Sequence, residues 1–189
     1  LSGELWYSDP PMRVFIVGVG ATGSLLAKLL PRQGHQVACG DRDPARARAF
    51  LGERSPLVIQ QVNARNLHSI TKAAKGCQLL INACPAVLNK IIMRAALRLR
   101  THYIDTASHL RTSPFRPEQL RFNRQFRKKK RLALIHAGVA PGLTNLLAIQ
   151  AATGLDRLDK VEVRIFEETA SEDPVSQWSA ESSFDEATS

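Results

Sequence analysis

The strongest constraint on the fold of this chain is a repeated alternation of short apolar runs with longer segments of helical spacing. The apolar runs, each of strand length, are residues 13–18, 35–41, 56–62, 77–84, 102–107 and 132–138. The helical segments that follow them are residues 21–32, 44–51, 67–75, 88–99, 117–130 and 142–152. Strands joined through helices pair in parallel by right-handed crossovers. The alternation therefore predicts an α/β fold with a doubly wound parallel sheet, the Rossmann architecture.

A glycine-rich junction lies where the first predicted strand meets the first predicted helix. Gly18, Gly20 and Gly23, with Ala21 and Thr22 between the last two, form a G-x-G-x-x-G pattern. In such a turn the first glycine allows a tight bend, the second admits a pyrophosphate, and the third lets helix pack closely on strand. Main-chain N–H groups and the positive end of the helix dipole then bind the phosphates. The junction predicts a dinucleotide site.

The end of the second predicted strand supports the same site. Asp41 follows Gly23 by 18 residues, where a carboxylate can accept hydrogen bonds from the adenosine ribose. This carboxylate favours NAD because it would repel a 2′-phosphate, whereas the guanidinium of Arg42 could pair with that phosphate. We expect NAD, with NADP as the alternative; a role in the turn and in helix capping would also explain Asp41 and Asp43 without a ligand.

Two later strand ends are predicted to border the cofactor, because ligands bind beyond the carboxyl ends of parallel strands. Ala83, Cys84 and Pro85 follow the fourth strand and would pass beside the nicotinamide-side ribose, although a tight turn around the proline explains them equally well. The loop after the sixth strand, which leads into a helix start, could meet a carboxamide or carboxylate; its shaping residues are Gly138, Pro141 and Gly142.

The fifth strand end supplies the candidates for proton transfer. Asp105 and Thr106 emerge at the predicted ligand edge, and His109 follows them in the loop. We assign catalysis to His109 and Asp105 and substrate contact to Thr106, although a role in an N-terminal turn explains Asp105 equally well. His136 lies inside an apolar run, which favours a hydrogen-bonded core histidine over a catalytic base.

The charge of the chain is unevenly distributed. The net charge is +9, yet residues 152–189 hold 10 Asp or Glu against 3 Lys or Arg, so the part with the glycines is strongly basic. The basic run 121–131 reads best as the solvated end of a helix, with Leu120 and Phe126 facing inward. No aromatic stacking platform accompanies it, so we do not expect nucleic acid as a partner. Nucleic-acid binding through Lys128, Lys129 and Lys130 remains a weaker alternative.

Other features exclude whole classes of protein. No apolar run reaches the length of a membrane helix, and the first residues lack the layout of a signal peptide, so we expect a cytoplasmic protein without membrane contact. Cys39, Cys77 and Cys84 lie in or beside apolar runs without metal-ligand spacing. They are predicted to be reduced core thiols, and we expect no metal.

The pattern changes after residue 152. Residues 160–168 alternate as a single predicted strand, and a polar, acidic segment follows. The predicted organisation is a tail over residues 1–11, a dinucleotide-binding domain over 12–152, and the start of an incomplete α+β second domain over 153–189.

Several motifs of this chain, in their order and spacing, resemble the N-terminal part of the saccharopine dehydrogenase family, including its lysine 6-dehydrogenase-like members. The motifs are "VFIVGVGATG", "GDRD", "LLINACPAVLN", "HYIDTA", "AGVAPGLTNLLA" and "WSAESSFDE". The resemblance covers roughly residues 12–189. The glycine motif is shared by many dehydrogenases, whereas the sixth-strand motif is more specific.

The resemblance implies an NAD(P)-dependent oxidoreductase of amino-acid metabolism, lysine metabolism in particular. Such enzymes transfer hydride between nicotinamide and a carbon as an amine and an imine interconvert, on a small amino-acid substrate or its conjugate. By position, Asp105 and Thr106 would border the substrate. Trp178 and Ser179 would belong to the contribution of the second domain.

The resemblance also implies a substrate domain beyond Ser189, so we expect this chain to be the cofactor-binding portion of such an enzyme, with an incomplete active site. A homodimer formed through that second domain is left open. The alternative is a non-catalytic dinucleotide-binding module that senses redox state or acts as a scaffold.

Overall fold

The predicted Rossmann sheet is present. The computed structural model describes residues 10–108, 116–164 and 166. Its parallel strands form one sheet in the order β3-β2-β1-β4-β5-β6. The strands are β1 (Arg13–Val17), β2 (Gln36–Asp41), β3 (Val58–Gln61), β4 (Leu79–Asn82), β5 (His102–Asp105) and β6 (Ala133–Leu134). Strand order reverses between β1 and β4, and ligands of such sheets bind at this point.

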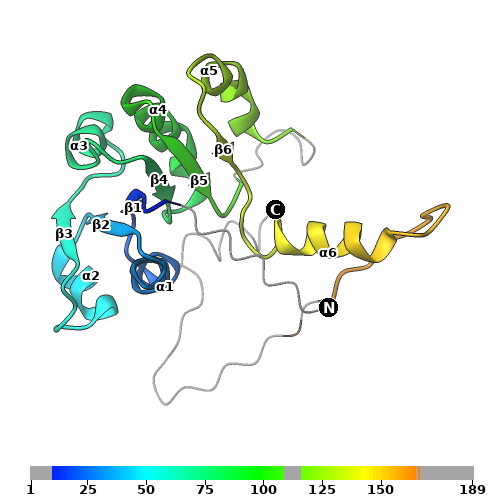
Figure 1. Cartoon of the computed structure of the whole chain (residues 1–189), viewed down its shortest axis with the longest axis horizontal. Helices are drawn as coiled ribbons and strands as arrows, with labels where there is room; N and C mark the ends of the chain where they lie inside the picture. The colour runs from blue at the N-terminus through cyan, green and yellow to red at the C-terminus, as the bar shows by residue number, and fades with distance from the viewer. Residues whose placement is uncertain (1–9, 109–115, 165, 167–189) are drawn as a thin grey trace.

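Helices cover both faces of the sheet (Figure 1). α1 (Ala21–Leu29) and α2 (Pro44–Leu51) lie on one face, and α3 (Leu67–Ala73), α4 (Asn89–Leu99) and α5 (Asn123–Lys128) lie on the other. Short 3-10 turns are also present at η1 (Leu30–Gln33), η2 (Ala86–Leu88) and η3 (Glu118–Phe122). α6 (Leu143–Ala152) follows β6.

Each helical layer encloses its own apolar core. Because side chains alternate along a strand, Val14 and Ile16 of β1 face the α1–α2 layer, whereas Phe15 and Val17 face the α3–α5 layer. All four are almost fully buried. β1 is therefore covered on both faces, as a central parallel strand should be.

Local capping explains where two helices begin. The side chain of Asp43 accepts a hydrogen bond from the N–H of Arg46 at the start of α2. The side chain of Asn66 accepts from the N–H groups of His68 and Ser69 at the start of α3. Such caps satisfy donors that a first helical turn leaves unpaired.

Arg100, which ends α4, offers a test of local backbone strain. It adopts a left-handed conformation with φ of 55°. Glycine adopts this conformation without the steric strain that a Cβ causes, so Arg100→Gly should stabilise the fold by about 0.5–1 kcal/mol. Arg98→Gly, inside the same helix, should instead destabilise it by about 1 kcal/mol. Urea unfolding of both variants measures the difference, and equal destabilisation would contradict the expectation.

The basic run packs through different residues than predicted. Phe126 is buried as expected, but Leu120 is 52% exposed and Phe122 occupies the inward position instead. The cause is that residues 118–122 form a 3-10 turn before α5, which changes the face that Leu120 presents.

β6 is much shorter than the predicted strand 132–138. His136 adopts a left-handed φ of 61°, and its N–H donates to the side chain of Asp105 rather than to a main-chain oxygen of β5. The extended conformation therefore ends before this residue.

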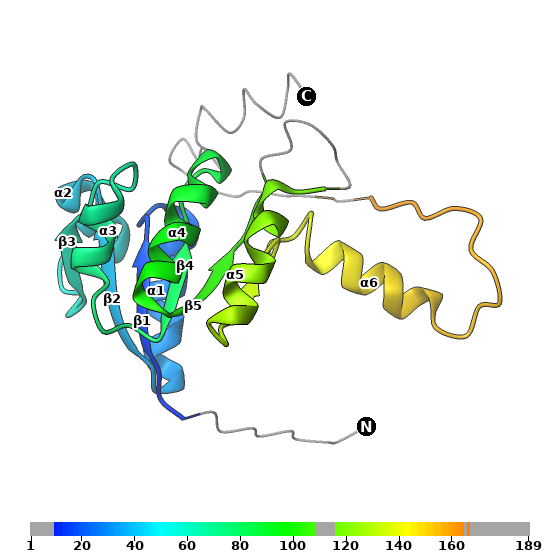
Figure 2. The same ribbon diagram turned by 90° about the horizontal axis from the view of Figure 1, so that it is seen from above.

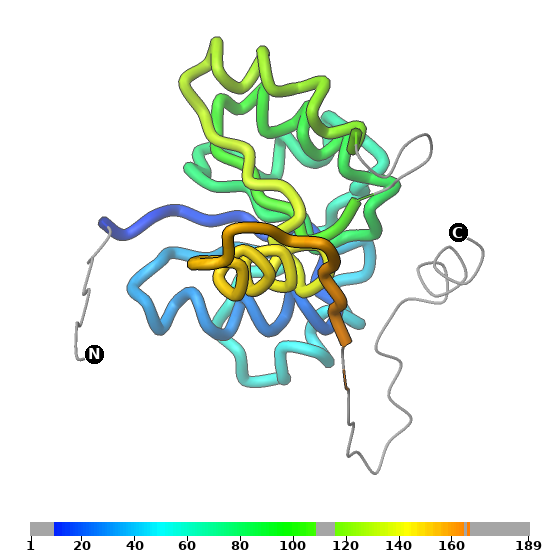
Figure 3. The backbone as a smooth tube through the Cα atoms, turned by 90° about the vertical axis from the view of Figure 1, so that its right-hand side faces the viewer, coloured from blue at the N-terminus to red at the C-terminus, as the bar shows by residue number. Residues whose placement is uncertain are grey.

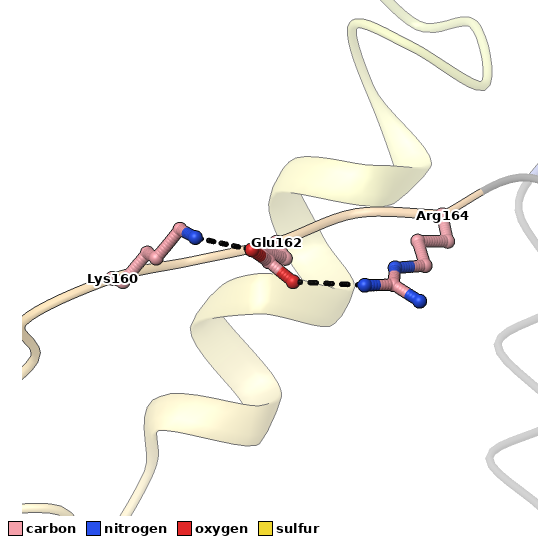
Figure 4. A network of polar contacts seen from close by, with 3 residues as sticks. All are labelled: Lys160, Glu162 and Arg164. Atoms are coloured by element: carbon pink, nitrogen blue, oxygen red, sulfur yellow. Dashed lines mark hydrogen bonds and ion pairs between the residues drawn. The ribbon is translucent and has the colours of Figure 1, made fainter.

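The predicted strand 160–168 is wrong for residues 160–164, which form no strand. This segment lies beside α6 (Figure 3), and Lys160 and Arg164 both pair with Glu162 along it (Figure 4). A strand needs a neighbour to pair its N–H and C=O groups, and the described residues place none beside this one.

α6 is apolar yet exposed. Leu146, Leu147 and Ile149 are each more than half exposed, and the helix projects from the sheet (Figure 2). No helix in the described ranges has the length and apolar character needed to cross a membrane.

Candidate dinucleotide-binding site

The glycine turn forms as the motif requires. Gly18 has φ of 92°, and a Cβ there would lie 2.8 Å from both the Ala83 oxygen and the Cys84 sulfur. A Cβ on Gly23 would lie 1.9 Å from the Gly18 oxygen. Gly18 thus turns the chain and Gly23 lets α1 approach it closely, which is the division of roles in such motifs.

Gly20 differs from both because the space beside it is open. A Cβ built there meets no atom within 4 Å, and its φ of −85° suits any residue. Nothing in the packing of the described residues requires glycine at this position. A ligand that must approach the main chain would explain it.

The first turn of α1 has unused donors. Gly20 provides no side-chain cap, and the N–H groups of Ala21, Thr22 and Gly23 meet no acceptor in the part of the chain that the structure describes. α2 and α3, in contrast, are capped by Asp43 and Asn66. Open donors, the helix dipole and open space beside Gly20 fit a diphosphate.

Asp41 fixes the glycine turn to the end of β2. Its Oδ2 accepts a hydrogen bond of 2.7 Å from the N–H of Val19, and its Oδ1 accepts one of 2.9 Å from the N–H of Asp43. The main chain therefore engages both carboxylate oxygens. Arg42 beside it is exposed, and its side chain forms no ion pair with the described residues.

The end of β4 forms the other wall of the glycine turn. Ala83 N–H donates to the Val17 oxygen, and the Cys84 sulfur lies 3.4 Å from that same oxygen. Burial, and to a smaller extent Asp41, raise the pKa of the Cys84 thiol to about 12, so the thiol remains protonated. Cys84 thus packs into this corner as a protonated thiol, and its predicted contact with the cofactor stays a prediction.

The other cysteines also behave as core thiols. Burial raises the pKa of Cys39 to about 11 and raises that of Cys77. Cys39, Cys77 and Cys84 are all free thiols in the structure. Within the described residues, no three His, Cys, Asp or Glu side chains group in a way that could hold a metal ion.

A buried polar network connects the carboxyl ends of β4 and β5. Asn82 and Asp105 are paired in the sheet register, and both are 1% exposed. Asn82 Nδ2 donates to Asn89 Oδ1 at 2.7 Å and to the Tyr103 hydroxyl at 3.2 Å. Asn89 then donates to the oxygen of Ala107. The network ties β4, α4 and the loop after β5 together.

Asp105 is the centre of this network. Its Oδ2 accepts from the Tyr103 hydroxyl at 2.9 Å and from Gln119 Nε2 at 3.4 Å, and its Oδ1 accepts from the N–H of His136 at 2.9 Å. Burial raises the pKa of this carboxyl, and the hydrogen bonds lower it in part. Tyr103, buried beside the carboxylate, has a pKa well above its usual value. Asp105 thus connects β5 to the segment after β6.

His136 does not occupy the predicted core position. It lies two residues past β6, half-buried, with Nε2 against the Ser108 hydroxyl. Burial lowers the pKa of its imidazole, and the Asp105 carboxylate raises it in part.

The loop 138–142 lies against the end of β5. A Cβ on Gly138 would lie 2.3 Å from the Thr106 oxygen, and one on Gly142 would lie 2.2 Å from the Gly138 oxygen. These glycines allow close main-chain packing, and they bring the loop with Pro141 to the same edge as Thr106. The predicted contacts of Thr106, Pro141 and this loop with substrate or cofactor stay predictions.

The structure thus brings most of the predicted site residues to one edge of the sheet. His109, Trp178 and Ser179 lie outside the described residues. Sequence reasoning missed the polar residues that support the edge, namely Asn82, Asn89, Tyr103, Ser108 and Gln119. The one available signal was an asparagine within the apolar run of β4.

Fold and site together define a dinucleotide-binding Rossmann domain. Residues 14–134 match the saccharopine dehydrogenase NADP binding domain family. The chain belongs to this family of NAD(P)-dependent oxidoreductase domains, and the cofactor class is a nicotinamide dinucleotide.

Two relatives agree with this assignment. Carboxynorspermidine synthase of Vibrio cholerae is 29% identical over 117 residues, which cover 57% of this chain and 28% of that protein. Apo saccharopine dehydrogenase (L-Glu forming) from Saccharomyces cerevisiae has the same fold, with a TM-score of 0.63 at 17% identity, over 74% of this chain and 30% of that one. The chain therefore spans less than a third of the length of both relatives.

Proposed function

We propose that this chain binds NADP(H) as the cofactor-binding portion of an oxidoreductase that acts on a C–N bond of an amino acid or amino-acid conjugate. The observation that carries the proposal is the uncapped first turn of α1 beside the open space at Gly20, within the segment that matches the family. The names of the two relatives, and the motifs that end β4, β5 and β6, support the substrate class.

The residues of this chain would bind and orient the cofactor. The N–H groups of the α1 first turn would hold the diphosphate, and the ends of β4 to β6 would border the nicotinamide. The bound cofactor supplies the hydride chemistry, and the protein supplies position and electrostatics.

Two observations favour NADP over the NAD expected from Asp41. Main-chain donors already engage both oxygens of the Asp41 carboxylate, and the guanidinium of Arg42 is exposed next to it. A guanidinium pairs well with a 2′-phosphate. The description of the matched family supports the same cofactor.

The proposal is tested in two stages. Saturable quenching of protein fluorescence by NADPH tests binding to the chain, and no binding at millimolar cofactor would refute it. Turnover with saccharopine or lysine is then measured on the polypeptide encoded by the complete reading frame. Cofactor binding without turnover of any amino-acid substrate would favour the redox-sensing or scaffold alternative.

Arg42→Glu tests the cofactor preference. Loss of a charged hydrogen bond to phosphate should weaken NADPH binding about tenfold or more while leaving NADH binding within about twofold. Arg54→Glu changes the net charge equally at an exposed residue beyond α2 and should leave both affinities unchanged. Equal loss of both affinities in Arg42→Glu would contradict a 2′-phosphate contact. The readout is the ratio of the two dissociation constants.

A further inference from the structure

The carboxyl edge of β4, β5 and β6 contains several titratable side chains, but they differ in access. Asp105 is 1% exposed and its oxygens accept from Tyr103, Gln119 and His136. Tyr103 is fully buried. The Cys84 thiol is held protonated by its raised pKa. His136 is half-buried and remains reachable.

Three contacts hold His136 in place. Its N–H donates to Asp105 Oδ1 at 2.9 Å, and the next N–H, that of Ala137, donates to the main-chain oxygen of Asp105 at 2.9 Å. Its Nε2 contacts the Ser108 hydroxyl, which in turn lies within hydrogen-bond distance of Gln119. Gln119 also donates to Asp105. The Asp105 hydrogen bonds thus hold the main chain at His136, and the Ser108 contact orients the imidazole.

We propose that the imidazole of His136, oriented by Ser108 and the Asp105 network, is the proton acceptor at the nicotinamide end of the site. The inference rests on the proposed function. As the C–H bond of the amine substrate breaks, its hydride passes to oxidised NADP⁺. The nitrogen lone pair forms the C=N bond, and the proton on that nitrogen passes to the imidazole of His136.

The charge environment suits this role. Among the described residues, the Asp105 carboxylate is the charged group that affects the pKa of the imidazole. The Tyr103 hydroxyl beside Asp105 stays neutral because its pKa is well above the usual value. The pKa of His136 lies below its ordinary value because burial outweighs the attraction of the carboxylate. The ring is therefore neutral, and able to accept a proton, at neutral pH.

Proton linkage of cofactor binding tests the proposal without substrate. A protonated His136 would repel the positive nicotinamide of NADP⁺ but not the neutral ring of NADPH. From pH 7.5 to pH 5.0, NADP⁺ affinity should fall roughly three- to tenfold more than NADPH affinity. Calorimetry in two buffers should show that NADP⁺ binding releases a proton below pH 6.5. Both cofactors carry the same 2′-phosphate, so its titration cancels.

Matched variants locate the proton. Asparagine tolerates the left-handed backbone at this position, so His136→Asn should leave the fold intact. It should abolish the difference between NADP⁺ and NADPH in how far affinity falls from pH 7.5 to pH 5.0. His68→Asn, at an exposed position of α3, should leave it unchanged. If His109→Asn abolishes this difference in pH dependence and His136→Asn does not, the proposal is overturned in favour of His109.

The outcomes separate the two proposals. No binding of either cofactor refutes the proposed function, whereas binding without proton release refutes the role of His136 alone. If His136→Asn does not fold, the His136 ring signals of the wild-type chain are followed by NMR. NADP⁺ should lower the pKa of that ring and NADPH should not, and an equal effect of both cofactors would overturn the proposal.

Discussion

Gly20→Val is expected to remove cofactor binding while the protein keeps its stability, and Gly23→Ala is expected to destabilise the fold. At Gly20 the space for a side chain is open and φ is −85°, so valine costs the apo protein about 1 kcal/mol or less. In the complex that side chain would occupy the space needed by the phosphates. NADPH affinity should fall about 30-fold or more.

The second variant isolates the structural role of the motif. The added methyl of Gly23→Ala would lie 1.9 Å from the Gly18 carbonyl, which is main chain and cannot rotate away. Overpacking of this kind costs about 3 kcal/mol and would lower the melting temperature by about 10 °C. Thermal melts and NADPH titrations of both variants distinguish the effects. If Gly20→Val loses stability and binding in parallel, the turn is structural only.

Asp105→Ala is expected to give the second large effect. It leaves the Tyr103 hydroxyl and the His136 N–H without their acceptor, whereas the Gln119 amide still donates to the Ala107 oxygen. Buried donors that lose a charged acceptor cost about 3–5 kcal/mol, measurable by urea unfolding. Asp105→Asn keeps the volume and one acceptor oxygen, so it should cost much less. Equal stability of wild type and the alanine variant would show that the network contributes nothing.

Wild type and Asp105→Asn are also expected to differ in how their stability depends on pH. The pKa of Asp105 is raised in the folded state, chiefly by burial. Its contribution to stability is therefore fully present below the unfolded pKa of about 3.9 and is lost as pH rises through the folded pKa. Asp105→Asn lacks this loss, so its stability should improve relative to wild type from pH 4 to pH 7. The opposite trend would indicate that hydrogen bonds outweigh burial.

The regular parts of the fold were predictable from the sequence because their signals are local. Apolar runs of strand length, helical spacing and the caps at Asp43 and Asn66 each depend on a few neighbouring residues. The prediction failed at residues 160–164 because alternation alone does not supply a pairing partner. It also overextended the sixth strand, since nothing local announces the left-handed turn at His136.

The candidate site divides in the same way. Gly18, Gly20 and Gly23 form a contiguous motif, and the sequence alone placed it at a strand-to-helix turn. The partners of Asp41 and Asp105 come from segments far apart in the chain, such as Val19 with Asp41 and His136 with Asp105. Their effects on charge and access depend on three-dimensional packing.

By itself, the sequence determined the order of strands and helices, the parallel sheet, and the turn that fits a diphosphate, because each arises from spacing along the chain. Only the tertiary structure decided which donors stay open, that Asp41 holds the glycine turn, and that a half-buried His136 lies beside a buried Asp105. Hydrogen bonding and burial depend on which side chains come into contact in the folded protein. These contacts join residues that are far apart in the sequence, so local spacing does not predict them.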